Sequence, residues 1–245
     1  MPRRLEICVD SIDSALAADR AGAHRIELCS SLLEGGLTPS AGVVRAVRQR
    51  VSLAVFVMIR PRGGDFLYSD AEFEAMKGDI RAAKSLGADG VVLGLLTEHG
   101  RVDAVRAREL VELARPLETT FHRAFDLSDD LDQSLEDVIA TGASRILTSG
   151  GAETAPEGAE QIRKLVEAAR HRIVIMAGSG IQSRNLRQVL AATSVAEVHA
   201  SAKAPVASPM RYQKNVAMGS GQQDEYTRQV ANEEEVRELR KILVD

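Results

Sequence analysis

The chain has no tryptophan, only two cysteines and only 3% aromatic residues among its 245 residues. Two cysteines cannot form the disulfide framework of a small secreted protein, so a reducing compartment suits the composition. With so few aromatic side chains, the chain lacks the stacking platforms that bind single-stranded nucleic acid. The formal net charge of −4 gives no electrostatic attraction toward nucleic acid or an anionic membrane surface.

Long apolar segments are absent as well. The longest strongly apolar run, residues 53–59, is far too short to cross a bilayer. The first residues lead straight into a strand pattern, without the apolar stretch of a secretory signal. We therefore expect a cytoplasmic protein that binds neither membranes nor nucleic acid.

What the chain does have is a repeated pattern of short apolar runs, each followed by a helical stretch. We predict strands at residues 5–10, 25–30, 53–60, 90–95, 119–123, 145–150, 173–178 and 197–201. The intervening stretches carry apolar residues at helical spacing behind capping residues, such as Ser69 with Glu72 three positions later. Eight strands alternating with helices predict an α/β protein of the (β/α)8 TIM-barrel type.

The predicted barrel accounts for the whole chain. We find no linker or change of composition that would divide it, so we expect one domain over residues 1–245. Two segments exceed a minimal barrel, and we predict long loops at residues 60–70 and 202–221. Both follow strands, so we expect them over the carboxyl face, where barrels bind their ligands.

Strands 5–10 and 25–30 carry unusual residues for a barrel interior. Because strand side chains alternate between faces, Glu6 shares a face with Cys8, and Glu27 shares one with Cys29. The residues between them are aliphatic and suit the helix-facing side. The acids and thiols are then expected to point into the barrel, where Val, Ile and Leu are usual.

A carboxylate inside a barrel needs a partner, and the candidates lie at other strand ends. We expect Glu27, Arg60, His122 and His199 to meet in one pocket at the carboxyl face. Acids, a guanidinium and imidazoles together suit acid–base catalysis or anion binding. The alternative is a buried salt-bridge network that only holds the barrel together.

The two cysteines also allow a metal site. Thiolates of Cys8 and Cys29 on neighbouring strands suit a soft ion such as Cu(I), and Met58 could add a thioether. The spacing is not a CxxC motif, and a free cysteine is often simply a small buried side chain.

The ends of the last three predicted barrel strands are rich in glycine and serine. Small residues let backbone N–H groups approach an anion, and barrels often hold phosphate in this region. The alternative is that these loops are only tight turns. The candidate anion-binding residues are Ser149, Gly150, Gly178, Ser179, Gly180, Ser201 and Ala202.

Several longer segments point to a family. The sequences at residues 6–11, 25–29, 56–68, 120–126 and 147–150 together resemble the copper homeostasis protein CutC family, and the similarity extends over nearly the whole chain. The resemblance implies a single-domain barrel, a cytoplasmic homo-oligomer and a role in copper handling. It also implies that Cys8 and Cys29 match the cysteines proposed to bind Cu(I) in that family.

Two functions of different classes therefore remain open. One is a cytosolic Cu(I)-binding protein of copper homeostasis. The other is a barrel enzyme that acts on a phosphorylated or carboxylated small molecule. In the second, Glu27 or His122 would move a proton, and Arg60 would hold a second negative group or a developing oxyanion.

Overall fold

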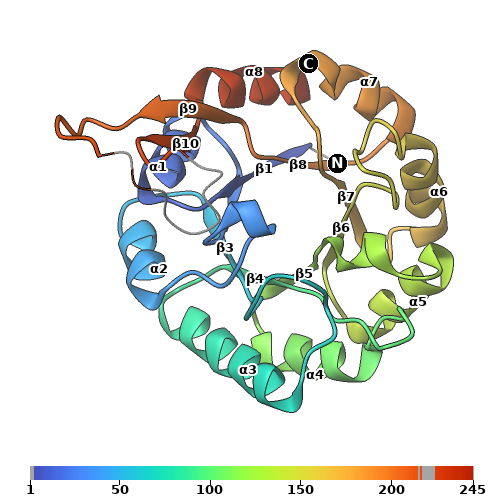
Figure 1. Cartoon of the computed structure of the whole chain (residues 1–245). Helices are drawn as coiled ribbons and strands as arrows, with labels where there is room; N and C mark the ends of the chain where they lie inside the picture. The colour runs from blue at the N-terminus through green and yellow to red at the C-terminus, as the bar shows by residue number, and fades with distance from the viewer. Residues whose placement is uncertain (1–2, 215, 217–223, 245) are drawn as a thin grey trace.

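The computed structural model describes residues 3–214, 216 and 224–244, and its central feature is a closed barrel of parallel strands. Eight strands follow one another around the barrel in chain order, and a ring of helices surrounds them (Figure 1). The predicted TIM barrel is confirmed. The strands are β1 (Arg4–Val9), β2 (Arg25–Leu28), β3 (Ala54–Met58), β4 (Gly90–Leu93), β5 (Glu118–Phe121), β6 (Arg145–Thr148), β7 (Val174–Ala177) and β8 (Glu197–Ala200).

The helices form where the sequence combines a capping residue with an apolar stripe. In α3, Ser69 and Glu72 form the expected capping box, and Phe73, Met76 and Ile80 are buried behind it. The helices are α1 (Ile12–Arg20), α2 (Ala41–Arg48), α3 (Asp70–Ser85), α4 (Ala104–Ala114), α5 (Leu131–Thr141), α6 (Ala159–Ala169), α7 (Ser183–Thr193) and α8 (Glu233–Val244), with short 3-10 turns η1 (Leu32–Glu34) and η2 (Arg123–Leu127). No helix in the described part of the chain is long and apolar enough to cross a membrane.

The strand register decides which side chains meet inside the barrel. Cys8 lies opposite Glu27 across the β1–β2 pair, and Glu6 lies opposite His199 across the β1–β8 pair. The intervening aliphatic residues of β1 and β2 join the core between strands and helices. The acids and thiols therefore face the barrel interior, as the alternation predicts.

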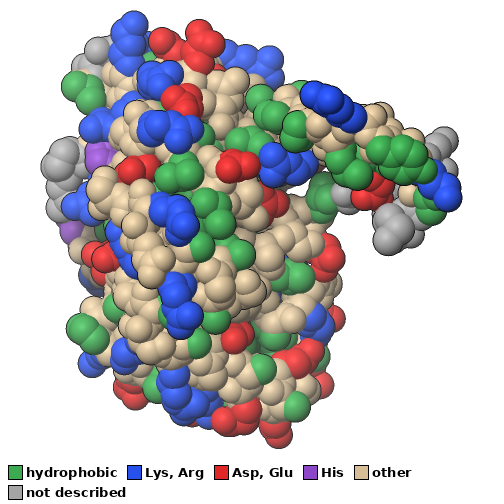
Figure 2. Space-filling view, turned by 90° about the vertical axis from the view of Figure 1, so that its left-hand side faces the viewer, with side chains coloured by type: hydrophobic (Ala, Val, Ile, Leu, Met, Phe, Trp, Pro, Cys, Tyr) green, Lys and Arg blue, Asp and Glu red, His purple; other side chains and the backbone are tan. Residues whose placement is uncertain are grey.

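Of the two predicted long loops, only the first is a loop throughout. Residues 60–69 form a loop between β3 and α3, as predicted. The prediction of a loop from residue 202 is wrong at its start, because β9 (Lys203–Ala207) pairs antiparallel with β10 (Thr227–Ala231). This hairpin projects from the barrel (Figure 2). Residues 215 and 217–221 of the predicted loop lie outside the described residues.

The strand β9 escapes sequence analysis for a physical reason. It contains Pro205 and is mostly exposed, so it shows neither an apolar alternation nor an uninterrupted run of strand formers. A two-stranded ribbon has only edge strands, and an edge strand tolerates the missing N–H of proline.

Candidate functional site

A cavity of about 860 Å³ lies at the carboxyl end of the barrel. It is lined by side chains from most of the strands and from the loops that follow them. Glu27, Arg60, His122 and His199 all line it, so the structure brings together the four residues expected to share a pocket. Cys8, Met58, Phe66 and Leu147 add sulfur and apolar surface.

The two thiols lie side by side at the base of this region. The Sγ atoms of Cys8 and Cys29 are 4.0 Å apart. Glu27 Oε2 accepts a hydrogen bond from Cys8 at 3.0 Å and a longer one from Cys29 at 3.5 Å. Both cysteines are free and buried, and Cys8 lines the cavity while Cys29 lies behind it. The sequence-predicted pair is therefore within reach of a single ion.

Both thiols are held in the protonated form. The hydrogen bond with Cys29, together with burial, raises the pKa of Cys8 well above its ordinary value. The hydrogen bond with Cys8 acts in the opposite direction on Cys29, but burial and the Glu27 carboxylate raise its pKa to about 12. A metal that binds here must displace these protons.

His199 links this thiol cluster to a second buried acid. Its Nδ1 lies 2.7 Å from Glu6 Oε1, and its Nε2 lies 3.9 Å from Glu27 Oε2. Burial opposes the imidazolium, but Glu27 and Glu6 raise the pKa of His199 well above its ordinary value. One donor atom from each of Cys8, Glu27 and His199 lies within 4.8 Å of the others, which is a possible metal-ligand group.

Arg60 is held by backbone rather than by acids. Its guanidinium donates to the carbonyl oxygens of Glu34 at 2.6 Å, Gly36 at 3.2 Å and Gly64 at 2.8 Å. It also lies over the Phe66 ring, 4.8 Å from the ring centre. Arg60 thus orders the loops after β2 and β3 while its charge remains at the cavity.

His122 is a neutral imidazole. Burial, with a contribution from Arg60, lowers its pKa to about 3. Its Nδ1 accepts a hydrogen bond from the Ala124 N–H at 3.1 Å and caps η2, so the proton is assigned to Nε2. The ring lies 5.0 Å from Phe66 between ring centres. His122 therefore offers a hydrogen-bond donor and not a base.

The loops after β7 and β8 reach the cavity only in part. Of the predicted anion-binding residues, Ser179, Gly180, Ser201 and Ala202 line it. Gly178 does not, because its N–H belongs to the β6–β7 ladder through the Thr148 carbonyl.

The first turn of α7 already holds a carboxylate. Glu235 accepts hydrogen bonds from the Ser183 N–H at 2.7 Å and the Ser183 hydroxyl at 2.8 Å. The positive end of the helix is thereby partly neutralised from within the chain.

Ser149 and Gly150 lie outside the cavity lining, contrary to expectation. Asp126 occupies the position predicted for an external anion. It accepts hydrogen bonds from the Ser149 N–H at 3.0 Å, the Ser149 hydroxyl at 3.0 Å and the Gly151 N–H at 3.1 Å. The sequence did not predict the role of Asp126, because a loop rich in glycine and serine has the same sequence pattern whether it binds an external anion or a carboxylate of the chain itself.

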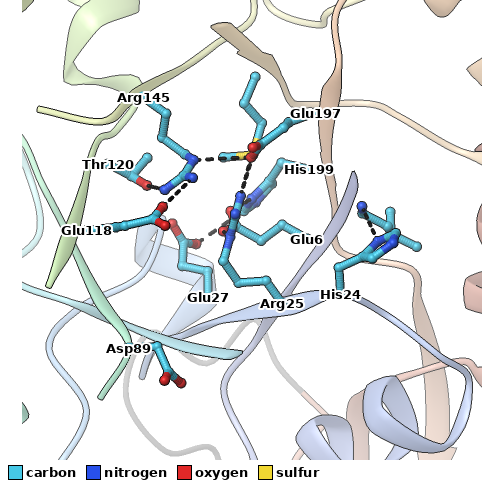
Figure 3. A network of polar contacts seen from close by, with 12 residues as sticks. Glu6, His24, Arg25, Glu27, Asp89, Glu118, Thr120, Arg145, Glu197 and His199 are labelled. Atoms are coloured by element: carbon cyan, nitrogen blue, oxygen red, sulfur yellow. Dashed lines mark hydrogen bonds and ion pairs between the residues drawn. The ribbon is translucent and has the colours of Figure 1, made fainter. Parts of the chain in front are cut away.

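A buried ion-pair network contains three residues that the sequence analysis did not identify, Arg25, Arg145 and Glu197. Arg25 lies between Glu6 and Glu197, and Arg145 contacts both Glu197 and Glu118 (Figure 3). Burial alone would raise the pKa of Glu6, but Arg25 and His199 hold it at about 2. A buried salt-bridge network that holds the barrel together is therefore present in addition to the cavity. It lies one layer of side chains below the thiols.

Comparison with known proteins identifies the family. The CutC family model matches residues 3–204. Copper homeostasis protein cutC homologs of Homo sapiens and Mus musculus are each 50% identical to this chain, covering 97% and 98% of it and 88% and 89% of their own lengths. A family protein CutC of Chromobacterium violaceum is 51% identical over 99% of both chains.

Solved structures agree with the sequence relatives. A crystal structure of a CutC protein from Streptococcus agalactiae is 36% identical, with a TM-score of 0.77 over 81% of this chain and 98% of that one. Thiamine phosphate pyrophosphorylase from Pyrococcus furiosus shares only the barrel fold, at 19% identity and a TM-score of 0.60 over 99% of this chain and 96% of its own. Because the family model spans most of the chain and the relatives match nearly all of it, this protein belongs to the CutC family.

Proposed function

We propose that this protein binds Cu(I) through Cys8 and Cys29 and serves copper homeostasis in the cytosol. The observation that carries the proposal is the pair of buried thiols with their sulfur atoms 4.0 Å apart. Metal–thiolate bonds are about 2.3 Å long, so two sulfurs on one ion lie at most about 4.6 Å apart. One ion fits between these sulfurs with little movement of β1 or β2.

The donor set supports a soft ion. Thiolate and thioether ligands favour Cu(I), zinc and iron–sulfur clusters over hard cations such as Mg²⁺ and Ca²⁺. Met58 packs in the same cluster as the two cysteines and could supply a third soft donor. Two relatives at 50% identity are named copper homeostasis proteins, which supports copper as the cargo. A reducing cytosol keeps both thiols free for the ion.

Glu27 would assist the exchange of protons for metal. Its Oε2 accepts hydrogen bonds from both thiols, so it lies where the released protons must go. Once the thiolates bind the ion, Glu27 would retain contact with His199 at the base of the cavity. Cys8 lines the cavity and Cys29 is buried behind it, so the ion would be reached from the cavity.

The test is a Cu(I) titration under strict reduction, against a chromophoric competing chelator. We expect one Cu(I) per chain for the native protein and loss of this binding in the Cys8→Ser/Cys29→Ser double variant. Met58→Leu should weaken binding, whereas Met210→Leu, at an exposed position, is the matched control. Equal affinity of the native protein and the double variant would contradict the proposal. Light scattering on the same samples tests the homo-oligomer that the family resemblance implies.

A further inference from the structure

Three residues that line the cavity each carry a buried polar atom without a hydrogen-bond partner in the described part of the chain. These atoms are Glu27 Oε1, Arg60 Nε and His122 Nε2. The three residues are only 3%, 5% and 4% exposed, so they are nearly buried in the cavity wall. Unpaired buried groups are costly and rare. Three of them around one cavity indicate that a ligand completes them.

The charge of the cavity wall favours an anion. Arg60 is a buried cation that contacts carbonyl oxygens and an aromatic ring, with no carboxylate within salt-bridge distance among the described residues. Arg184 and Lys203 add exposed cations at the rim. The acids of the lining are Glu27 and Glu235, and Glu235 is engaged by Ser183. An anionic ligand would supply the charge that Arg60 lacks.

The chemistry of the unpaired atoms narrows the choice of ligand further. Arg60 and His122 both contact Phe66, at 4.8 Å and 5.0 Å from its ring centre, and each offers one free N–H. A carboxylate has two oxygens that can accept from two N–H donors. Burial raises the pKa of Glu27. Its free Oε1 can therefore pair with a neighbouring hydroxyl group, or with an ammonium group when Glu27 is ionised.

We propose that this cavity binds a small organic carboxylate, with Arg60 and His122 on the carboxylate and Glu27 on a neighbouring hydroxyl or ammonium group. The cavity volume of about 860 Å³ lies within the range of ligand pockets, about 300–1,000 Å³. The proposal goes beyond copper binding and concerns different atoms, since neither thiol takes part. A phosphate at the start of α7 is less favoured, because Glu235 already occupies that position.

The test uses copper-free protein and simple probes. Isothermal titration and thermal shift are measured with glycolate, L-lactate, L-malate and L-serine, and with inorganic phosphate and glycerol 3-phosphate, each up to about 20 mM. The diagnostic variant is His122→Asn, because asparagine can still accept from the Ala124 N–H and cap η2 while it removes the Nε2 donor. The matched control is His171→Asn, at an exposed left-handed position outside the cavity that asparagine tolerates.

We expect saturable binding of at least one carboxylate to the native protein and to His171→Asn. His122→Asn should keep its circular dichroism spectrum and its Cu(I) binding but lose about tenfold or more in carboxylate affinity. Binding of the phosphates without the carboxylates, no binding of any carboxylate, or equal carboxylate binding by His122→Asn would overturn the proposal. Cu(I) binding and carboxylate binding are measured separately, so a negative result for one proposal does not decide the other.

Discussion

Replacing Arg25 by methionine should expose how much the buried network contributes to the barrel. Arg25 is 3% exposed and pairs with Glu6 and Glu197 across the barrel interior. Methionine has a similar length and no charge, so the variant leaves Glu6 and Glu197 with one cationic partner fewer. Glu6 would retain His199, and Glu197 would retain Arg145.

The magnitude follows from the pKa of Glu6. Its lowering from 4.5 to about 2 corresponds to about 3 kcal/mol of folding free energy, and Arg25 is the largest of the groups that lower it. Removal of one partner from a buried ion pair typically costs about 3–5 kcal/mol. We therefore expect Arg25→Met to lower the free energy of unfolding by about 3–5 kcal/mol at neutral pH.

The stability difference between Arg25→Met and the native protein should depend on pH. A carboxyl whose pKa is lowered by folding stabilises the protein above pH 4.5, and this contribution is lost as the pH falls toward about 2. In the variant the pKa of Glu6 is less depressed, so the stability difference from the native protein should shrink over that range. Urea unfolding followed by circular dichroism measures it, with Arg228→Met, in an exposed pair with Asp13, as the control. A variant within about 1 kcal/mol of the native protein at pH 7, or a difference that persists unchanged at acid pH, would refute the reasoning.

Two further predictions concern the cavity. Gly94→Ala would place a methyl group 2.5 Å from the His122 ring, so it should cost about 1–3 kcal/mol in urea unfolding. Gly78→Ala, in α3 with open space around it, should instead stabilise by up to about 1 kcal/mol, and equal stability of the two variants would show that His122 is not tightly held. Cu(I) affinity should rise with pH between about pH 6 and pH 8, up to about 100-fold per pH unit, because the pKa values of Cys8 and Cys29 are raised and both thiols must lose protons. A competition titration that shows no pH dependence would argue against thiolate ligation.

Most of the site could be predicted from the alternation of side chains in β1 and β2. A period of two places Glu6, Cys8, Glu27 and Cys29 on one side of the strands, and a barrel has only one interior. The meeting of these residues with His199 follows from the closure of the barrel between β1 and β8. Fold and inner face were therefore accessible from local patterns.

The same alternation could have found the buried network. Arg25 lies two residues before Glu27, and Glu197 lies two residues before His199, so each shares the inner face of its strand. The sequence alone does not reveal that Arg25 and Glu197 are only 3% and 7% exposed. Burial at the amino end depends on how the other strands fill that layer.

Contacts between loops could not be predicted from the sequence, for a different reason. Asp126 fills the turn after β6 from 23 residues away, and Glu235 reaches Ser183 from 52 residues away. Both depend on loop conformations that no periodic pattern specifies. Glycine and serine in a turn predict an anion-binding site, but they do not show whether the anion is a ligand or a carboxylate of the chain itself.

X-ray absorption spectroscopy of the Cu(I)-loaded protein tests the central claim most directly. We expect a copper environment of two or three sulfur atoms at about 2.3 Å, which changes when Cys8 or Cys29 is replaced by serine. Copper surrounded by nitrogen and oxygen atoms alone, or a spectrum that the cysteine variants leave unaltered, would contradict a thiolate site between β1 and β2.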